Sequence, residues 1–212
     1  MKYKQLAQTI EQLEAESALE LVQQLVAGGE SPAEILAASR AGMEGVGKRF
    51  EGGEYFVADL MLSANLFQEI MQILEPVLSA DTRLMESKGK VVIATVKEDI
   101  HDIGKNLVIA MLSANGFEVV DLGVNVDPDV ICQAIIREQP HILALSCLLT
   151  STLDGIEDTI AELEKQGLRD KVKVIVGGAP VTAKLAQQFG ADAYGADAYD
   201  AVPQCLALME GR

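Results

Sequence analysis

The spacing of apolar residues in this 212-residue chain changes once, near residues 81–89, and this change limits the fold more than any other feature. Before it, apolar residues recur with the spacing of amphipathic helices. After it, short runs rich in β-branched residues alternate with amphipathic stretches, which is typical of a parallel sheet covered by helices on both faces. The sequence therefore predicts an α/β protein, with a helical part over residues 1–88 and a flavodoxin-like or Rossmann-like domain with a five-stranded parallel sheet over residues 89–212.

The N-terminal part is expected to form four helices, because pairs of glycines interrupt the helical pattern. Ser31 and Glu34 form an S-x-x-E capping box with a proline at the first helical position, which marks the start of the third helix. The fourth helix should run from about Val57 to the neighbourhood of Pro76. These helices form a separate unit if the polar segment 81–89 is a domain boundary.

Five short runs after that boundary are expected to be the strands. They are Lys90 to Val96, Phe117 to Gly123, Ile142 to Cys147, Lys173 to Gly178 and the weaker Ala191 to Gly195. In open parallel sheets, ligands bind at the carboxyl ends of the strands. The segments that directly follow the strands are therefore where a functional site is expected.

Composition and charge exclude several classes of protein. The formal net charge of −15 disfavours nucleic acid and favours partners with basic surfaces. No apolar run approaches the ~20 residues of a membrane span, and the N-terminus lacks the apolar stretch of a signal peptide, so we expect a cytoplasmic protein with no membrane contact. Cys132, Cys147 and Cys205 form no CxxC pair and are odd in number, which favours buried reduced thiols over disulfides or zinc.

The loop after the first predicted strand places a histidine among carboxylates. It contains neither of the glycine-rich phosphate-binding patterns, so neither a dinucleotide nor a nucleoside triphosphate is supported. Asp99 can hydrogen-bond one ring nitrogen of His101, which would fix the tautomer as carboxylates do for metal-bound imidazoles. Gly104 would let the chain lie close beneath a large planar ligand. A ligand-binding histidine is favoured here over an ordinary surface histidine.

Hydroxyl groups follow the third predicted strand, at Ser146, Thr150 and Thr152. A phospho-accepting receiver domain would need an aspartate at this point, and the sequence has none. The hydroxyls can donate hydrogen bonds to a ligand or to the histidine–carboxylate pair, or they can cap the helix expected from Leu153. After the fourth strand, the Gly-Gly pair at residues 177–178 removes side-chain bulk where a ligand could enter.

Together these segments resemble the cobalamin-binding domain of methionine synthase and of corrinoid proteins from methyltransferase systems. The matching motifs are Asp99-x-His101-x-x-Gly104, Ser146-x-Leu148 and Gly177-Gly178. In that family the benzimidazole tail of the cofactor leaves cobalt and enters a slot beside the sheet, while the motif histidine binds cobalt from below.

The resemblance assigns roles to individual residues of this chain. His101 is the expected cobalt ligand, and Asp99 and Thr152 are expected to relay protons to it. Thr152 replaces the serine of methionine synthase and keeps the hydroxyl. The remaining expected contacts to the corrinoid from the α/β domain are Glu98, Ile100, Asp102, Gly104, Ser146, Leu148, Thr150, Gly177, Gly178 and Ala198.

The N-terminal part resembles the helical cap of the same family. The matching residues are Val46-Gly47-x-x-Phe50 and Gly53-Glu54-Tyr55-Phe56-x-x-Asp59. The resemblance implies that Phe56 covers the upper face of the corrinoid, whereas the alternative is that Tyr55 and Phe56 are ordinary core aromatics. Val57-Ala58 stands where many relatives have Leu-Pro, so the fourth helix is expected to start differently.

The resemblance implies a free-standing corrinoid subunit that carries a methyl group on cobalt, a component of a multi-subunit methyltransferase rather than a complete enzyme. Its expected partners are a donor-specific methyltransferase, an acceptor methyltransferase and a reductive activase. Methanol, methylamines, betaines and aryl methyl ethers are all candidate donors, with tetrahydrofolate or a thiol as acceptor. The alternatives are an adenosylcobalamin mutase subunit, a cobalamin-dependent sensor and a cofactor-free interaction module.

The cap is also expected to move. A cap that shields cobalt from solvent must open before a methyl group can be transferred, and the polar segment 81–89 is the expected hinge.

Overall fold

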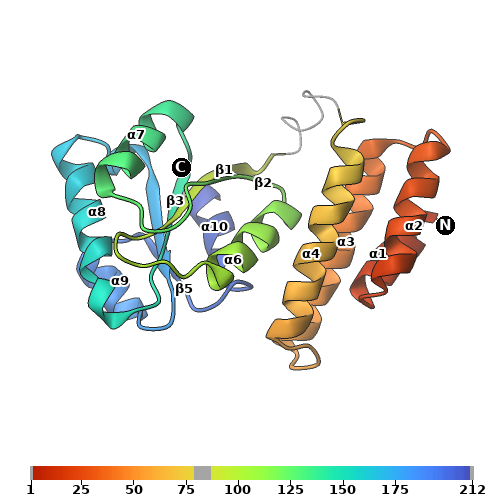
Figure 1. Cartoon of the computed structure of the whole chain (residues 1–212), viewed down its shortest axis with the longest axis horizontal. Helices are drawn as coiled ribbons and strands as arrows, with labels where there is room; N and C mark the ends of the chain where they lie inside the picture. The colour runs from red at the N-terminus through yellow and green to blue at the C-terminus, as the bar shows by residue number, and fades with distance from the viewer. Residues whose placement is uncertain (1, 79–86, 211–212) are drawn as a thin grey trace. The chain divides into compact units, whose positions relative to one another are not determined.

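The computed structural model describes residues 2–78 and 87–210 (Figure 1). The chain divides into two compact units, the first formed by the N-terminal helices and the second by most of residues 88–212. Each unit is described by itself. The expected hinge at residues 81–89 falls mostly on positions outside the described residues. No helix of the described part is both long enough and apolar enough to cross a membrane.

Residues 2–78 contain the four expected helices. They are α1 (Lys2–Glu11), α2 (Ala15–Ala27), α3 (Pro32–Glu51) and α4 (Val57–Leu74). Helix α3 packs against α1 and α4, and α4 also packs against α2. The core between them is formed by fully buried apolar side chains such as Ile10, Val22, Met43 and Phe67. The sequence did not locate the boundary between α1 and α2, where Leu13 adopts a left-handed conformation with φ of 59°.

The starts of α3 and α4 follow from local hydrogen bonds. The Ser31 hydroxyl accepts a hydrogen bond from the backbone N–H of Glu34 at 3.5 Å, as expected for a capping serine. At α4, the Asp59 carboxylate accepts from the backbone N–H of Phe56 at 2.8 Å. A carboxylate in the first turn also interacts favourably with the helix dipole. The fourth helix therefore begins directly after Phe56, with no proline in its first turn.

The second unit is an α/β domain with a five-stranded, all-parallel sheet in the order β2-β1-β3-β4-β5. Its strands are β1 (Gly89–Thr95), β2 (Phe117–Asp121), β3 (Ile142–Ser146), β4 (Lys173–Gly177) and β5 (Ala193–Gly195). Its helices are α6 (Ile103–Ala114), α7 (Pro128–Glu138), α8 (Asp154–Lys165), α9 (Ala183–Phe189) and α10 (Ala201–Glu210), with short 3-10 turns at Thr150–Thr152 and Arg169–Lys171. The predicted fold class is confirmed. The first four strands end one or two residues before their predicted ends, and β5 ends at Gly195 as predicted but starts two residues later.

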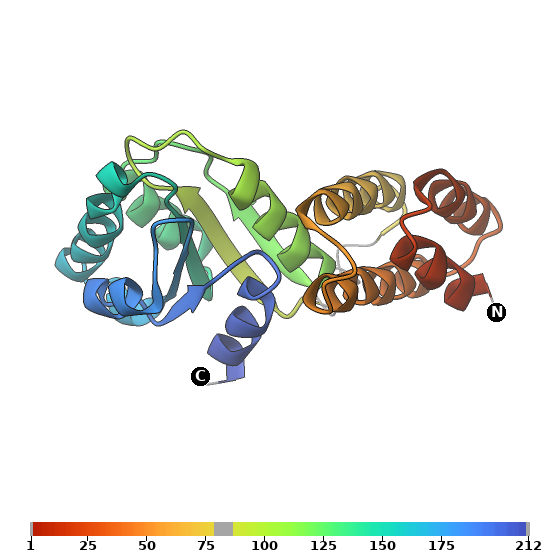
Figure 2. The ribbon, with the colours of Figure 1, turned by 90° about the horizontal axis from the view of Figure 1, so that it is seen from below.

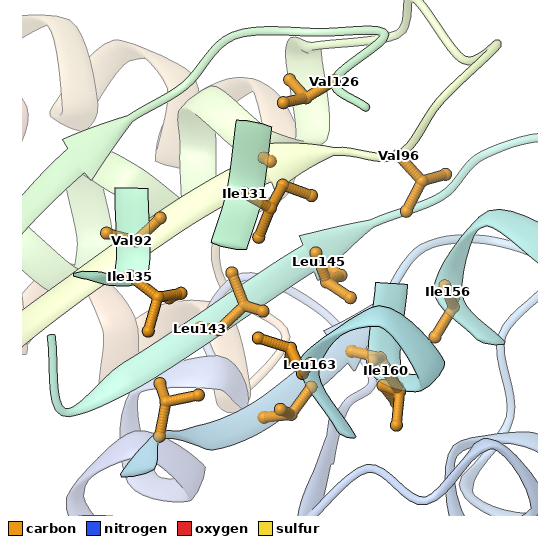
Figure 3. Packing of buried hydrophobic residues seen from close by; sticks show 14 of the residues in the cluster. Val92, Val96, Val126, Ile131, Ile135, Leu143, Leu145, Ile156, Ile160 and Leu163 are labelled. Atoms are coloured by element: carbon orange, nitrogen blue, oxygen red, sulfur yellow. The ribbon is translucent and has the colours of Figure 1, made fainter. Parts of the chain in front are cut away.

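The two faces of the sheet are packed differently. Helices α7, α8 and α9 cover one face, and α6 and α10 lie on the other (Figures 1 and 2). On the first face, side chains of β1 and β3 such as Val92 and Leu145 pack densely against Ile135 of α7 and Ile160 of α8 (Figure 3). This dense layer holds the sheet in register and leaves the α6 and α10 face for a site.

The order of the strands fixes where that site lies. The chain passes from β1 to β2 in one direction and from β3 to β4 in the other, so the sheet has its switch point between β1 and β3. The loops that follow these two strands diverge there and leave a crevice at their carboxyl ends. The His101 loop follows β1, and the Ser146 segment follows β3.

Candidate functional site

The His101 ring is held by a buried carboxylate from its own loop. The Asp99 Oδ1 atom lies 2.7 Å from His101 Nδ1 and also accepts a hydrogen bond from the His101 backbone N–H at 3.1 Å. Asp99 is fully buried, whereas the His101 side chain is 45% exposed. This geometry places the proton of the neutral ring on Nδ1. The other ring nitrogen, Nε2, has no hydrogen-bond partner among the described residues and keeps its lone pair.

The second oxygen of Asp99 is bound by the segment after β3. Its Oδ2 atom accepts hydrogen bonds from the backbone N–H groups of Leu148 at 2.7 Å and Leu149 at 3.2 Å, and from the Thr152 hydroxyl at 3.2 Å. Burial alone would raise the pKa of Asp99. The Leu148 N–H, the His101 ring and the other backbone donors outweigh burial and lower that pKa to about 2. Asp99 is therefore a carboxylate at neutral pH.

The Thr152 hydroxyl has competing partners. Besides Asp99, it lies 3.0 Å from the Leu149 carbonyl oxygen and 3.3 Å from the sulfur of Cys147. A hydroxyl donates only one hydrogen bond at a time, so Thr152 donates either to Asp99 or to Leu149. The predicted contact between Thr152 and Asp99 is present, while its role in proton relay stays a prediction.

Three further contacts that the sequence did not suggest fix the loop backbone. Glu98 has a left-handed φ of 66°, and its N–H donates to the Asn125 side chain at 2.7 Å. The Asn125 N–H in turn donates to the Asp99 carbonyl oxygen at 2.8 Å. The Thr95 hydroxyl at the end of β1 donates to the His101 carbonyl oxygen at 2.9 Å. Each of these contacts ends on a backbone atom, so no sequence motif indicates them.

An ion pair between the buried Lys105 and the partly exposed Asp121 anchors the start of α6 to β2. Both carboxylate oxygens of Asp121 accept from the Lys105 amine at 2.6 Å, and the Lys105 side chain is almost fully buried. Asp121 also accepts from the backbone N–H of Gly123 at 2.8 Å. Removing one partner of such a pair leaves an uncompensated buried charge, so the pair holds the helix that follows the His101 loop in one position.

A cavity of about 510 Å³ opens beside the histidine, between α6 and α10 on their face of the sheet. Two rows of register partners on neighbouring strands form its wall on the sheet side. The row at the carboxyl ends of the strands contains Ser146 and Gly177, and the row two residues earlier along the strands contains Ile93, Ala144 and Ile175. The helices contribute Gly104, Lys105, Val108 and Leu112 from α6, and Ala201 and Cys205 from α10. Small residues on this face leave a space that larger side chains would fill.

The predicted glycines differ in what they allow. A Cβ added at Gly104 would meet open space, whereas one at Gly178, where φ is 124°, would collide with the carbonyl oxygen of Cys147. A Cβ at Gly177 would lie 2.9 Å from the Gly195 carbonyl oxygen. Gly177 and Gly178 are therefore required by the close approach of neighbouring backbone, in addition to any contact with a ligand.

The structure brings most of the predicted residues of the α/β domain to this crevice. The cavity is lined by Ile100, His101, Asp102, Gly104, Ser146, Leu148, Gly177, Gly178 and Ala198, while Asp99 and Thr152 form the network behind the histidine. Thr150 is exposed in the turn before α8 and neither lines the cavity nor bonds to Asp99. Glu98 contributes its backbone only.

Large apolar side chains surround the histidine at the surface. Ile100 and Ile103 are 71% and 68% exposed, and Leu148 and Leu149 are also exposed. The two leucines lie close to the histidine, since their backbone N–H groups donate hydrogen bonds to the Asp99 carboxylate that binds His101. Such an exposed apolar group around one imidazole is typical of a binding surface rather than of an ordinary surface.

In the helical unit, the two aromatics before α4 are not both core residues. The Tyr55 hydroxyl donates to the Glu11 carbonyl oxygen at 2.9 Å, and its ring lies under the Arg49 guanidinium. Phe56 is 70% exposed and is followed on α4 by the exposed Val57 and Leu62. The interpretation of Phe56 as a core aromatic is therefore wrong, while its contact with a corrinoid stays a prediction.

Comparison with protein families identifies both units. The B12 binding domain family matches residues 89–203, and a second family described as a B12 binding domain matches residues 3–75. The two matches cover the sheet domain and the four helices described above.

Similar proteins cover almost the whole chain. The trimethylamine corrinoid protein 1 of Methanosarcina acetivorans is 36% identical over 201 residues, covering 94% of this chain and 93% of the relative. A cobalamin-binding protein from Desulfitobacterium hafniense has a TM-score of 0.78 at 36% identity, covering 97% of this chain and 98% of that chain. A chain of the methanol:cobalamin methyltransferase complex from Methanosarcina barkeri has a TM-score of 0.85 at 30% identity, covering 98% of this chain and 79% of that chain.

Proposed function

The chain belongs to the B12-binding corrinoid proteins of methyltransferase systems, and on that basis we propose that it carries a methyl group on a bound corrinoid from a donor methyltransferase to an acceptor methyltransferase. The observation that carries this proposal is the exposed imidazole of His101, which a buried carboxylate orients from behind.

The residues at the crevice fit a corrinoid. A flat macrocycle needs an apolar surface around its metal ligand, and Ile100, Ile103 and Leu148 supply exposed apolar side chains beside His101. The nucleotide tail of the cofactor needs a deep slot next to the macrocycle, and the cavity between α6 and α10 opens there. The chain's own side chains supply an apolar surface and a cavity at the two places where such a cofactor would need them.

His101 would hold cobalt through Nε2. The hydrogen bond to Asp99 leaves Nε2 as the nitrogen with a free lone pair. Because the pKa of Asp99 is lowered to about 2, the carboxylate stays ionised at neutral pH, and the proton between the two groups lies on the imidazole. A corrinoid held there would supply the methyl-transfer chemistry through its cobalt. The protein supplies binding, orientation and the placement of one proton.

We propose two further contacts. The Thr152 hydroxyl would stabilise the negative charge of Asp99 by donating a hydrogen bond, since it lies within hydrogen-bond distance of the carboxylate. Phe56 would contact the corrinoid from the helical unit, since a phenylalanine that is largely exposed at the start of a helix has no partner in its own core.

The methyl donor is set by the partner. A trimethylamine corrinoid protein is 36% identical over nearly the full length, and a methanol:cobalamin methyltransferase complex contains a similar fold. We therefore place methylamines and methanol first among the donors, before betaines and aryl methyl ethers. A second methyltransferase would pass the methyl group to tetrahydrofolate or a thiol, and a reductive activase would restore the reduced cofactor.

The proposal is tested by reconstituting the protein with cobalamin, reducing it and adding one donor methyltransferase with its methyl donor at a time. Methylation of the bound cofactor, followed by absorbance and mass spectrometry, should occur with at least one donor class and much faster than with free cobalamin at the same concentration. A protein that binds cobalamin but is methylated by none of these enzymes would instead support a sensor.

A further inference from the structure

The backbone of the His101 loop adopts a conformation that its residues do not favour by themselves. Glu98, three residues before the histidine, has a left-handed φ of 66°. Glycine takes up this conformation freely, whereas a residue with a Cβ does so at an energetic cost. Backbone of this kind persists only where neighbouring contacts hold it. The contacts that hold Glu98 therefore bear on the position of the histidine.

Asn125, in the loop after β2, binds the strained segment at two points. Its side-chain oxygen accepts a hydrogen bond from the Glu98 N–H at 2.7 Å, and its own N–H donates to the Asp99 carbonyl oxygen at 2.8 Å. The two bonds bracket residues 98 and 99. The second bond comes from the backbone and is open to any residue except proline, so the first bond is the one that depends on the asparagine side chain.

The two loops run together before they reach this point. Val96 and Val126 form an isolated parallel bridge beyond the ends of β1 and β2. The Lys97 amine lies 2.6 Å from the Asp127 carboxylate, although both side chains are half exposed and solvent weakens the pair. Asn125 makes the next contacts between the loops on the side of the histidine, and there its side chain takes the place of a backbone acceptor.

The position of Asp99 passes directly to the histidine. Its carboxylate binds both the ring and the backbone N–H of His101, at 2.7 and 3.1 Å. The segment after β3 holds that carboxylate, whereas Asn125 holds the backbone from which it projects. Asn125 does not itself line the cavity beside the histidine, so any effect on a ligand there must pass through the loop.

We propose that Asn125 is a positioning residue for the metal ligand: its side-chain oxygen keeps Glu98 in the left-handed conformation and so presents His101 already ordered for cobalt. The inference rests on the proposed function, since it assumes that His101 binds cobalt. The imidazole must replace another ligand of the metal, and a loop that first has to be ordered would give up part of the affinity gained by that bond.

Calorimetric titration of the apoprotein with cobalamin tests this role. Asn125→Ala should weaken binding about fivefold, because an ordinary hydrogen bond is lost from a loop that must be ordered in the complex. Asn125→Asp keeps an oxygen at the same place and should stay within about twofold of the parent. An Asn125→Ala protein with the affinity of the parent would overturn the proposal.

Substitutions at Glu98 show whether Asn125 acts against the backbone strain. Glu98→Gly in the Asn125→Ala protein should recover part of the lost affinity, because glycine adopts the left-handed conformation without support. Glu98→Ala is the matched control, since it removes the same side chain but keeps the Cβ, and it should recover none. Equal affinities for the two double variants would show that the strain at Glu98 is not what Asn125 opposes.

The His101→Ala background separates positioning of the histidine from general damage. There, Asn125→Ala should leave cobalamin affinity unchanged, because no imidazole remains to be placed. A fivefold loss that persists in this background would exclude an action through the histidine. If the parent binds no cobalamin, or if His101→Ala binds it as tightly as the parent, the proposed role of His101 fails and this inference fails with it. If His101→Ala weakens binding and Asn125→Ala does not, only the positioning role fails.

The loop can also be followed in the absence of the cofactor. Amide hydrogen exchange of the apoprotein, measured by nuclear magnetic resonance, should become severalfold faster at His101 in Asn125→Ala, since its N–H bond to Asp99 depends on the ordered loop. The amide of Val92, in the middle of β1, should exchange as in the parent and serves as the control for global unfolding. Unchanged exchange at His101 would show that the Asn125 side chain does not hold the loop.

Discussion

Asp99 joins the two halves of the crevice through a single carboxylate. One oxygen binds the histidine loop after β1, and the other binds the backbone N–H groups and the Thr152 hydroxyl after β3. Charge-assisted hydrogen bonds to a buried carboxylate are stronger than neutral ones. The orientation of His101 thus depends on contacts with a segment about fifty residues away along the chain.

Replacing Asp99 by Asn should lower the free energy of unfolding of the apoprotein by about 2 kcal/mol at pH 7. The asparagine side chain has one NH₂ group, which would face N–H groups that donate hydrogen bonds to the carboxylate in the parent. Because the folded-state pKa of Asp99 is lowered to about 2 from the usual 3.8, its stabilisation is complete above about pH 4 and is lost as the pH falls through about 2. Urea unfolding at decreasing pH should therefore show the difference between parent and variant narrowing below pH 4.

Thr152→Val is the matched comparison for that variant. It removes one neutral donor to Asp99 and preserves the charge, so it should cost about 1 kcal/mol and leave the pH dependence close to that of the parent. An Asp99→Asn protein as stable as the parent at pH 7 would show that the network does not stabilise the fold.

The sheet register produces both the network and the slot. Thr95, Ser146 and Gly177 form one row at the carboxyl ends of three adjacent strands. Thr95 binds the histidine loop, whereas Ser146 and Gly177 border the cavity. A shift of one residue in β3 or β4 would turn these side chains to the densely packed face.

The glycines after the strands give a prediction about this architecture. Gly178→Ala should destabilise the protein by about 3 kcal/mol or more, because the new methyl group collides with the Cys147 carbonyl at a φ of 124°. Gly104→Ala, where a Cβ meets open space, should change stability by less than about 0.5 kcal/mol and weaken corrinoid binding. Thermal unfolding and cofactor titration of both variants measure these effects.

A Gly178→Ala protein as stable as the parent would contradict the close approach of the Cys147 carbonyl to Gly178. A Gly104→Ala protein that binds cobalamin like the parent would show in addition that Gly104 does not lie close to the ligand.

The fold and the central pair of the site could be predicted from sequence because their signals are local. Periodicity indicates strands and helices, and Asp99 and His101 lie in one loop two residues apart. Asn125 and Thr95 could not be predicted, since their side chains bind backbone atoms of the histidine loop, which carry no sequence signal. The turn between α1 and α2 was missed because a leucine adopts the left-handed conformation that usually marks a glycine.

The charge of the whole molecule bears on how it meets its partners. A formal net charge of −15 on 212 residues creates a field that reaches beyond the crevice. A carrier must meet a donor enzyme and an acceptor enzyme in turn, so fast association with basic surfaces is an advantage over tight binding.

Methyl transfer from a donor methyltransferase should therefore slow as salt increases. We expect kcat/KM for the carrier to fall severalfold between low salt and about 0.3 M salt, because the Debye length shortens to a few ångströms. Free cobalamin as methyl acceptor is the control and should show little salt dependence. A kcat/KM that does not change with salt would show that the charge of the protein does not steer its association with the methyltransferase.

The identity of the axial cobalt ligand decides whether the crevice works as described. Electron paramagnetic resonance of the protein loaded with divalent cobalt cobalamin shows splitting by the axial nitrogen, and nitrogen-15 labelling of histidine changes that splitting from three lines to two if a histidine is bound. We predict this change in the parent, and its loss in His101→Ala, because Asp99 holds His101 with Nε2 free for cobalt. A three-line pattern that persists in the labelled parent would mean that the benzimidazole stays on cobalt, and it would contradict the role of His101.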